Sequence, residues 1–129
     1  MKRITTLLAA MALVLAVSVP TVLASGGGGT RIALKSAKAF PAAKGSAKFK
    51  AKPGEREFQA EVEHIRRLSG KKVSFFVGGK RLASARVNAF GAAEINRNSE
   101  RGQFVPAVSN GTKVTVRTAA GALIVRGSF

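Results

Sequence analysis

The chain contains a single histidine, His64, which follows the glutamates Glu61 and Glu63. General acid–base and nucleophilic catalysis commonly use such a base, oriented by a second polar group. Adjacent side chains on a strand point to opposite faces, so Glu63 cannot orient His64 in an extended segment. The chain has no Cys and no Asp, and no Ser occupies a Gly-x-Ser-x-Gly turn. These features predict that the protein is not an enzyme.

Metal ligands are also scarce in this sequence. Zinc and copper sites need three or four ligands from His, Cys or carboxylates, and calcium loops need clustered oxygen ligands. One His and the spaced glutamates Glu57, Glu61 and Glu63 do not supply such a set. We therefore expect no metal site and no cofactor.

Positive charge is the dominant chemical feature of the chain. Lys and Arg number 22 against six acidic residues, for a net charge of +16. The densest basic run lies between residues 66 and 72, and dense positive charge attracts polyanions. We predict a polyanion-binding site formed by Arg66, Arg67, Lys71, Lys72, Lys80 and Arg81. The alternative is that this charge serves solubility alone, because lysines on a strand face are usually solvated.

The first 24 residues have the three parts of a secretory signal peptide. Lys2 and Arg3 precede an apolar run over residues 7–17. Pro20 follows this run and would break a helix, and Ala24 ends a small-residue cleavage motif. We predict cleavage after Ala24 and a location outside the cytoplasm, either secreted or in the periplasm or cell envelope. After processing we expect no membrane span. The alternative is an uncleaved anchor, because residues 4–24 are nearly long enough to cross a bilayer.

The predicted export restricts the partners of the domain. We expect no intracellular nucleic acid, and we expect anionic polysaccharide, lipopolysaccharide or another anionic surface polymer as the ligand. The chain has no Tyr and no Trp, so it is poorly equipped to stack on sugars or exposed bases. The alternative is a protein–protein or adhesion module that uses open sheet edges near residues 104–108 and the loop 96–102.

The mature chain is predicted to be one all-β domain. Residues 25–29 are mostly glycine and indicate a flexible tether before a domain over residues 30–129. From Thr30 onward, apolar and polar residues alternate, and turn residues recur every 8 to 12 positions. This pattern predicts a small antiparallel β-sandwich of seven to eight short strands.

The clearest element is a hairpin over residues 45–65 with its turn at Pro53-Gly54. Facing residues have numbers that add up to 107, so Lys50 faces Glu57 and Phe49 faces Phe58. Charged residues then share one face and apolar residues the other. A shift of one residue would break all of these pairs at once, which is why we expect this register.

A second hairpin is predicted from residues 73–77 and 80–87, with Gly78-Gly79 as its turn and Phe75 facing Leu82. The polar stretch 96–102 is expected to be the longest loop and a place for function. Pro106 is expected to confine the short strand 104–108 to an edge. Further strands are predicted over residues 92–96, 112–118 and 123–129.

From Val73 onward the chain resembles a type of small exported bacterial β-domain of unknown function. The residues that carry the resemblance are the turn glycines, core residues and terminal aromatic Gly91, Ala93, Ile95, Gly102, Val105, Pro106, Val108, Gly111, Val114, Val116, Gly121, Leu123, Gly127 and Phe129. The resemblance implies export and a sandwich fold, and it implies no catalytic or binding residues.

Overall fold

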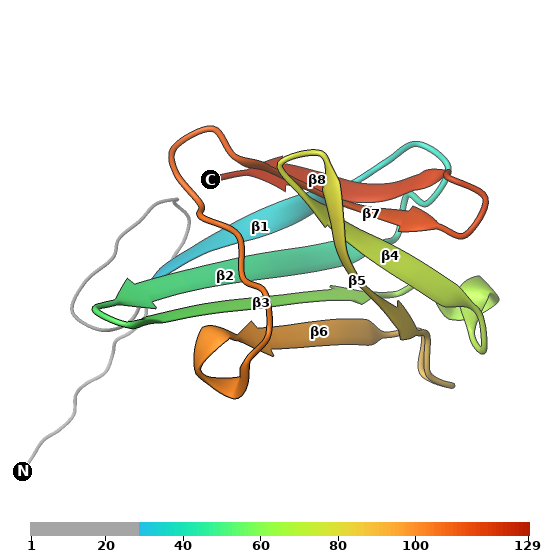
Figure 1. The fold of residues 1–129 in the computed structure, drawn as a ribbon. Helices are drawn as coiled ribbons and strands as arrows, with labels where there is room; N and C mark the ends of the chain where they lie inside the picture. Colours follow the sequence, from blue (N-terminus) through green and yellow to red (C-terminus); the bar gives the residue numbers. More distant parts are fainter. Residues whose placement is uncertain (1–28) are drawn as a thin grey trace, which may run out of the picture.

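The computed structural model describes residues 29–129, which form eight strands and two single-turn 3-10 helices (Figure 1). The predicted signal peptide, residues 1–24, and residues 25–28 of the predicted tether lie outside the described residues. The elements are β1 (Thr30–Ser36), β2 (Lys44–Lys52), β3 (Glu55–Glu63), η3 (Arg66–Leu68), β4 (Lys72–Val77), β5 (Lys80–Arg86), β6 (Ala93–Asn98), η4 (Ser99–Arg101), β7 (Lys113–Thr118) and β8 (Leu123–Ser128).

The eight strands form one antiparallel sheet in the order β5-β4-β7-β8-β1-β2-β3-β6. The sheet curves until its edge strands, β5 and β6, approach each other, so the fold is barrel-like and nearly closed (Figure 1). The all-β prediction is confirmed, whereas the expected pair of separate sheets is replaced by this continuous sheet. Alternation with a period of two is common to both architectures, so the sequence could not separate them. The join between β1 and β8 is short, with Lys35 opposite Arg126 and Ser36 opposite Val125.

The predicted first hairpin is confirmed in its full register. In β2 and β3, Lys44 pairs with Glu63, Phe49 with Phe58 and Lys52 with Glu55. Gly54 adopts a φ of 82°, which completes the turn after Pro53. The sequence specified this register because polar and apolar sets alternate on both strands.

The second hairpin forms as predicted, but its register contains a bulge. Gly78 and Gly79 make the turn, and Val77 pairs with Lys80. The register then shifts between Phe75 and Phe76, so Phe75 faces Ala83 and the predicted contact with Leu82 is wrong. Leu82 is the extra residue on β5, and both Leu82 and Ala83 are half-buried against the core, while Phe75 on β4 is fully buried.

Two predictions in the region 96–112 are wrong. Residues 96–98 continue β6, where Asn98 pairs with Glu57, so 96–102 is not the longest loop. The longest connection between strands runs from the end of β6 to β7 and includes residues 104–108, which form no strand. Pro106 lacks an N–H for a ladder. Val105 nevertheless enters the core, where it is 2% exposed, so this connection packs against the sheet.

The core lies inside the curved sheet and is built mainly from residues that alternate inward on β2, β3, β4, β6 and β7, while β5 contributes only partly buried side chains. Its largest fully buried side chains include Phe58, Phe75 and Ile124. Phe129, the last residue, packs edge-to-face on Phe58 with ring centroids 6.4 Å apart. Burying a side chain of this size contributes about 1.5–3 kcal/mol, so this closing contact ties β8 to β3 across the barrel.

The strand connections divide between two ends of the barrel. The β1–β2, β3–β4, β5–β6 and β7–β8 connections lie at one end, and the β2–β3, β4–β5 and β6–β7 connections lie at the other (Figure 1). Strictly alternating strand directions produce this division, and it determines which charged residues meet.

Candidate anion-binding surface

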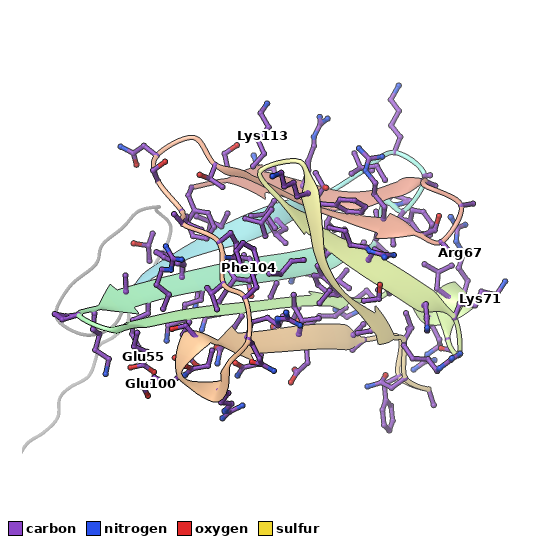
Figure 2. All side chains as sticks on the ribbon, viewed as in Figure 1. Glu55, Arg67, Lys71, Glu100, Phe104 and Lys113 are labelled. Carbon is purple, nitrogen blue, oxygen red and sulfur yellow. The ribbon has the colours of Figure 1, made fainter. Side chains whose placement is uncertain are left out.

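The structure brings together four of the six residues predicted to bind polyanions. Arg66 and Arg67 lie on η3, and Lys71 and Lys72 follow where the chain enters β4. All four side chains are exposed at the end of the barrel that holds the β3–β4 connection. Figure 2 shows Arg67 and Lys71 close together at that end.

Lys80 and Arg81 do not belong to this group. They begin β5, directly after the Gly78-Gly79 turn, at the opposite end of the β4–β5 hairpin. Lys72 and Val77 are five residues apart on β4, which corresponds to about 17 Å along a strand. In the sequence, Lys71-Lys72 and Lys80-Arg81 lie close together because they flank the same strand. In the fold, the length of that strand puts the two pairs at opposite ends.

Two cations that the sequence analysis did not include join the four. Arg86 faces Lys72 across the β4–β5 ladder, and Lys38 lies in the β1–β2 connection next to Ala39. Arg86 reaches this position through the bulge, because an unshifted ladder would put Ala85 opposite Lys72. We name these six exposed residues the basic end: Lys38, Arg66, Arg67, Lys71, Lys72 and Arg86.

Two of these arginines are held in place by contacts with the protein. The guanidinium of Arg67 lies 4.2 Å from the centroid of the buried Phe40 ring and donates a hydrogen bond to the carbonyl of Ala39. The Arg86 guanidinium donates to the carbonyl of Gly70. Each guanidinium has five N–H donors, so both retain donors for an anion. These cations are therefore positioned before any ligand arrives.

The β3–β4 and β5–β6 connections pack directly on each other. The Ile65 N–H donates to the carbonyl of Gly91 at 3.0 Å, and the Gly70 N–H donates to that of Val87 at 2.8 Å. Gly91 has a φ of 82°, and a Cβ there would lie 2.6 Å from the Arg66 nitrogen. Only glycine combines this backbone conformation with so close an approach. The two connections therefore form one surface that carries the basic end.

Negative charge is confined to one side of the barrel. All six glutamates lie on β3, β6 and η4, whereas β5, β4, β7, β8, β1 and β2 contain none. Among the described residues, the only ion pair within 4.0 Å joins Lys52 Nζ to Glu55 Oε1, at 3.4 Å. The cations of the basic end are thus not neutralised by neighbouring carboxylates at ion-pair distance.

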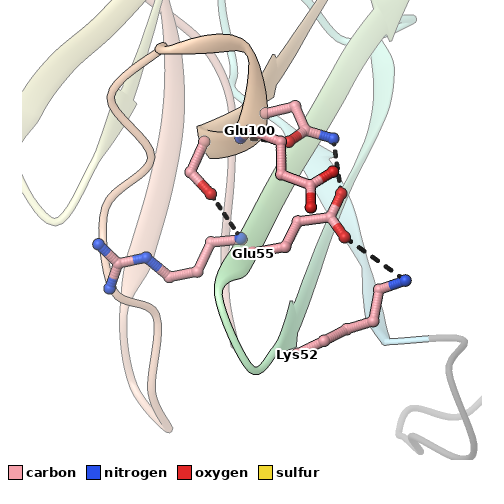
Figure 3. Close-up of polar contacts among 6 residues, drawn as sticks. Lys52, Glu55 and Glu100 are labelled. Atoms are coloured by element: carbon pink, nitrogen blue, oxygen red, sulfur yellow. Dashed lines mark hydrogen bonds and ion pairs between the residues drawn. The ribbon is translucent and has the colours of Figure 1, made fainter.

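The other end of the barrel carries a compact polar cluster (Figure 3). Asn98 Nδ2 donates to Glu55 Oε2 at 2.9 Å, and Asn98 Oδ1 accepts from the Glu100 N–H at 2.8 Å. Together with Lys52, the Asn98 amide holds the pKa of Glu55 below its ordinary value. Ser99 Oγ accepts from the Arg56 N–H. These side chains fasten η4 to β3, so much of the polarity of residues 96–102 has a structural role.

The structure offers little support for the catalytic geometry that His64 would need. His64 is exposed directly after β3, with a φ of 63°, and no hydrogen bond joins it to Glu61 or Glu94 in the part of the chain described. A pocket of about 350 Å³ lies between β3, β6 and the end of β5, with Glu61, Glu63, Glu94 and Arg86 among its lining residues. Its carboxylates make it unsuited to an anion. Within residues 29–129, no three His or Glu side chains are grouped so that they could hold a metal ion.

Over residues 29–129, the structure contains no helix with the length and apolar character needed to cross a membrane. Neither known protein-family models nor curated protein sequences match this chain. The resemblance to small exported bacterial β-domains stays a prediction.

Proposed function

We propose that this domain is a non-enzymatic interaction module of an exported protein, and that it binds anionic surface polymers through the basic end. The main support is the charge distribution: six exposed cations share one end of the barrel, and in the part of the chain described none of them forms an ion pair with a carboxylate within 4.0 Å. Concentrated charge of one sign attracts polyanions and accelerates their association. Anionic polysaccharide and lipopolysaccharide are the ligands that fit an exported domain.

The rigid mounting of the basic end supports the same proposal. Arg67 stacks on Phe40, Arg86 is hydrogen-bonded to Gly70, and the two connections are joined by backbone hydrogen bonds. Prepositioned cations lose less conformational entropy when an anion binds. A repeating polymer of sulfate, phosphate or carboxylate groups would engage several of them at once.

The test is binding of the whole chain to heparin, lipopolysaccharide and duplex DNA over a series of salt concentrations. We expect binding at low salt that weakens steeply as salt is added, because each contact releases counterions. The variant Arg66→Glu/Lys71→Glu should lower the salt slope on DNA by roughly 1.5–2, since each lost phosphate contact removes about 0.9.

The matched control is Lys80→Glu/Arg81→Glu, which makes the same change in charge at the other end of the β4–β5 hairpin. We expect this control to retain most of the affinity. Absence of binding at low salt would refute the proposal. Equal losses in the two variants would show that net charge, and not the basic end, determines binding.

A second candidate is a protein-binding module that uses sheet edges. One observation favours it: the outer edges of β5 and β6 pair with no other strand in the described part of the chain. Such edges accept an added strand from a partner. Binding of a protein partner that survives the change Arg66→Glu/Lys71→Glu and is insensitive to salt would favour this candidate over polyanion binding.

A further inference from the structure

A mostly exposed phenylalanine stands within the basic end. Among residues 29–129, the large hydrophobic side chains with high exposure are Phe90, at 80%, and Phe104, at 67%. Phe90 lies in the β5–β6 connection, between Asn88 and Gly91, whereas Phe104 lies in the β6–β7 connection at the other end of the barrel. The charge contacts that hold a polyanion do not themselves use an apolar side chain at the tip of the site.

The turn that carries Phe90 is held rigidly. Asn88 Oδ1 accepts hydrogen bonds from the N–H groups of Phe90 and Ala92, at 2.9 and 3.1 Å. The Gly91 N–H donates to the Asn88 carbonyl at 3.0 Å, which closes the turn. The exposed ring is therefore presented on a fixed backbone and not on a loose loop.

Phe90 is also fixed relative to the cations. Its neighbour Gly91 accepts a hydrogen bond from the Ile65 N–H and lies so close to Arg66 that a Cβ would overlap the Arg66 backbone. On the other side of the turn, the Val87 N–H donates to the carbonyl of Lys71 at 2.9 Å. The aromatic tip and the arginines and lysines beside it thus belong to one platform.

An apolar side chain surrounded by Lys and Arg matches the interface of an anionic membrane. The ring enters the boundary between headgroups and acyl chains, and the cations remain with the headgroup phosphates. We propose that the basic end docks on an anionic phospholipid bilayer, with Phe90 inserted at the interface. This inference rests on the proposed anion-binding function, whose ligand it specifies as a lipid surface.

The chain permits a direct spectroscopic test because it contains no Trp and no Tyr. Phe90→Trp places a single fluorophore at the proposed tip, and Phe104→Trp places one on the exposed residue at the other end. The probes are vesicles of equal parts phosphatidylglycerol and phosphatidylcholine, vesicles of phosphatidylcholine alone, and heparin. Both variants are otherwise identical whole chains, so any binding through other segments is common to both.

We expect anionic vesicles to shift the emission of Phe90→Trp to shorter wavelength, because the indole enters an apolar medium. Neutral vesicles and heparin should cause no such shift, and Phe104→Trp should not respond to any probe. Phe90→Ser should lower the affinity for anionic vesicles about tenfold or more in cosedimentation, through loss of the buried apolar area. Its affinity for heparin should stay within about twofold of the parent, because the charge at the basic end is unchanged.

The outcomes separate the two proposals. Heparin binding without a vesicle-induced shift at position 90 would overturn bilayer docking and leave the anion-binding function standing. Absence of binding to heparin and to anionic vesicles would overturn both proposals. Equal shifts at positions 90 and 104 would show that the basic end is not the docking surface.

Discussion

At the scale of single residues, the basic end depends on a glycine more than on any of its cations. Gly91 combines a φ of 82° with an approach to the Arg66 backbone that leaves no room for a side chain. Cations on flexible side chains can shift by an ångström and still attract an anion. A side chain at position 91 would push the β3–β4 and β5–β6 connections apart and move Phe90 away from Arg66. Gly91 therefore determines how this surface is arranged.

Gly91→Ala should therefore destabilise the fold. The left-handed backbone costs about 1–2 kcal/mol for a residue with a Cβ, and displacing the Arg66 backbone adds roughly 1–3 kcal/mol. The control is Gly54→Ala, because Gly54 has the same φ of 82° and open space around its Cβ position. Denaturant unfolding should show the larger loss for Gly91→Ala. Equal losses would mean that the contact with Arg66 contributes nothing to stability.

At the scale of elements, local pattern predicted the first hairpin completely and the second only in part. Between β2 and β3, nearly all residues have a partner of matching character, with Ala51 opposite Arg56 as an exception, so one register satisfies both faces. Between β4 and β5, the bulge leaves Leu82 without a direct partner, and both Leu82 and Ala83 pack against a core assembled from strands far away in the sequence. The missed bulge also affects the candidate site, because Arg86 faces Lys72 only in the shifted register.

The connection between β6 and β7 shows the same limit. The short strand predicted over residues 104–108 does not form: these residues pair with no strand, and Val105 packs in the core. The sequence marks Val105 as a core residue only through the resemblance to small exported β-domains. It could not indicate that the neighbouring edges, on β5 and β6, would remain unpaired. Pairing of residues distant in sequence is decided by the closure of the whole sheet.

If this connection is part of the core, a small buried residue in it should matter more than a large exposed one. Val105→Ala should cost about 1.5–3 kcal/mol through lost burial and the cavity left behind. Phe104→Ala removes more atoms, but Phe104 is 67% exposed and should change stability by no more than about 0.5 kcal/mol. Thermal or denaturant unfolding of both variants measures the difference. A larger loss for Phe104→Ala would contradict the packing described for residues 104–108.

At the scale of the whole molecule, the excess of positive charge underlies the proposed function and also opposes folding. Residues 29–129 hold 20 Lys and Arg and 6 Glu, a net charge of +14. Only the Lys52–Glu55 ion pair lies within 4.0 Å in this part of the chain. The sequence alone predicted the net charge and the run 66–72. It could not predict that Lys80 and Arg81 lie at the other end from Arg66, because that follows from the path of the strands.

Such an excess of unpaired positive charge repels itself in the folded state, so salt should stabilise this protein. Raising NaCl from ~0.01 to ~0.3 M shortens the screening length from about 30 Å to below 10 Å, which weakens repulsion across the barrel while leaving the apolar core intact. If the gain is about 1 kcal/mol, Tm should rise by roughly 4–8 °C for a domain of this size. Lys80→Glu/Arg81→Glu exchanges two positive charges for two negative ones and should respond less to salt. A Tm that falls with added NaCl would mean that attraction between β3 glutamates and β2 lysines outweighs repulsion, and most of the cations would then already be engaged within the fold.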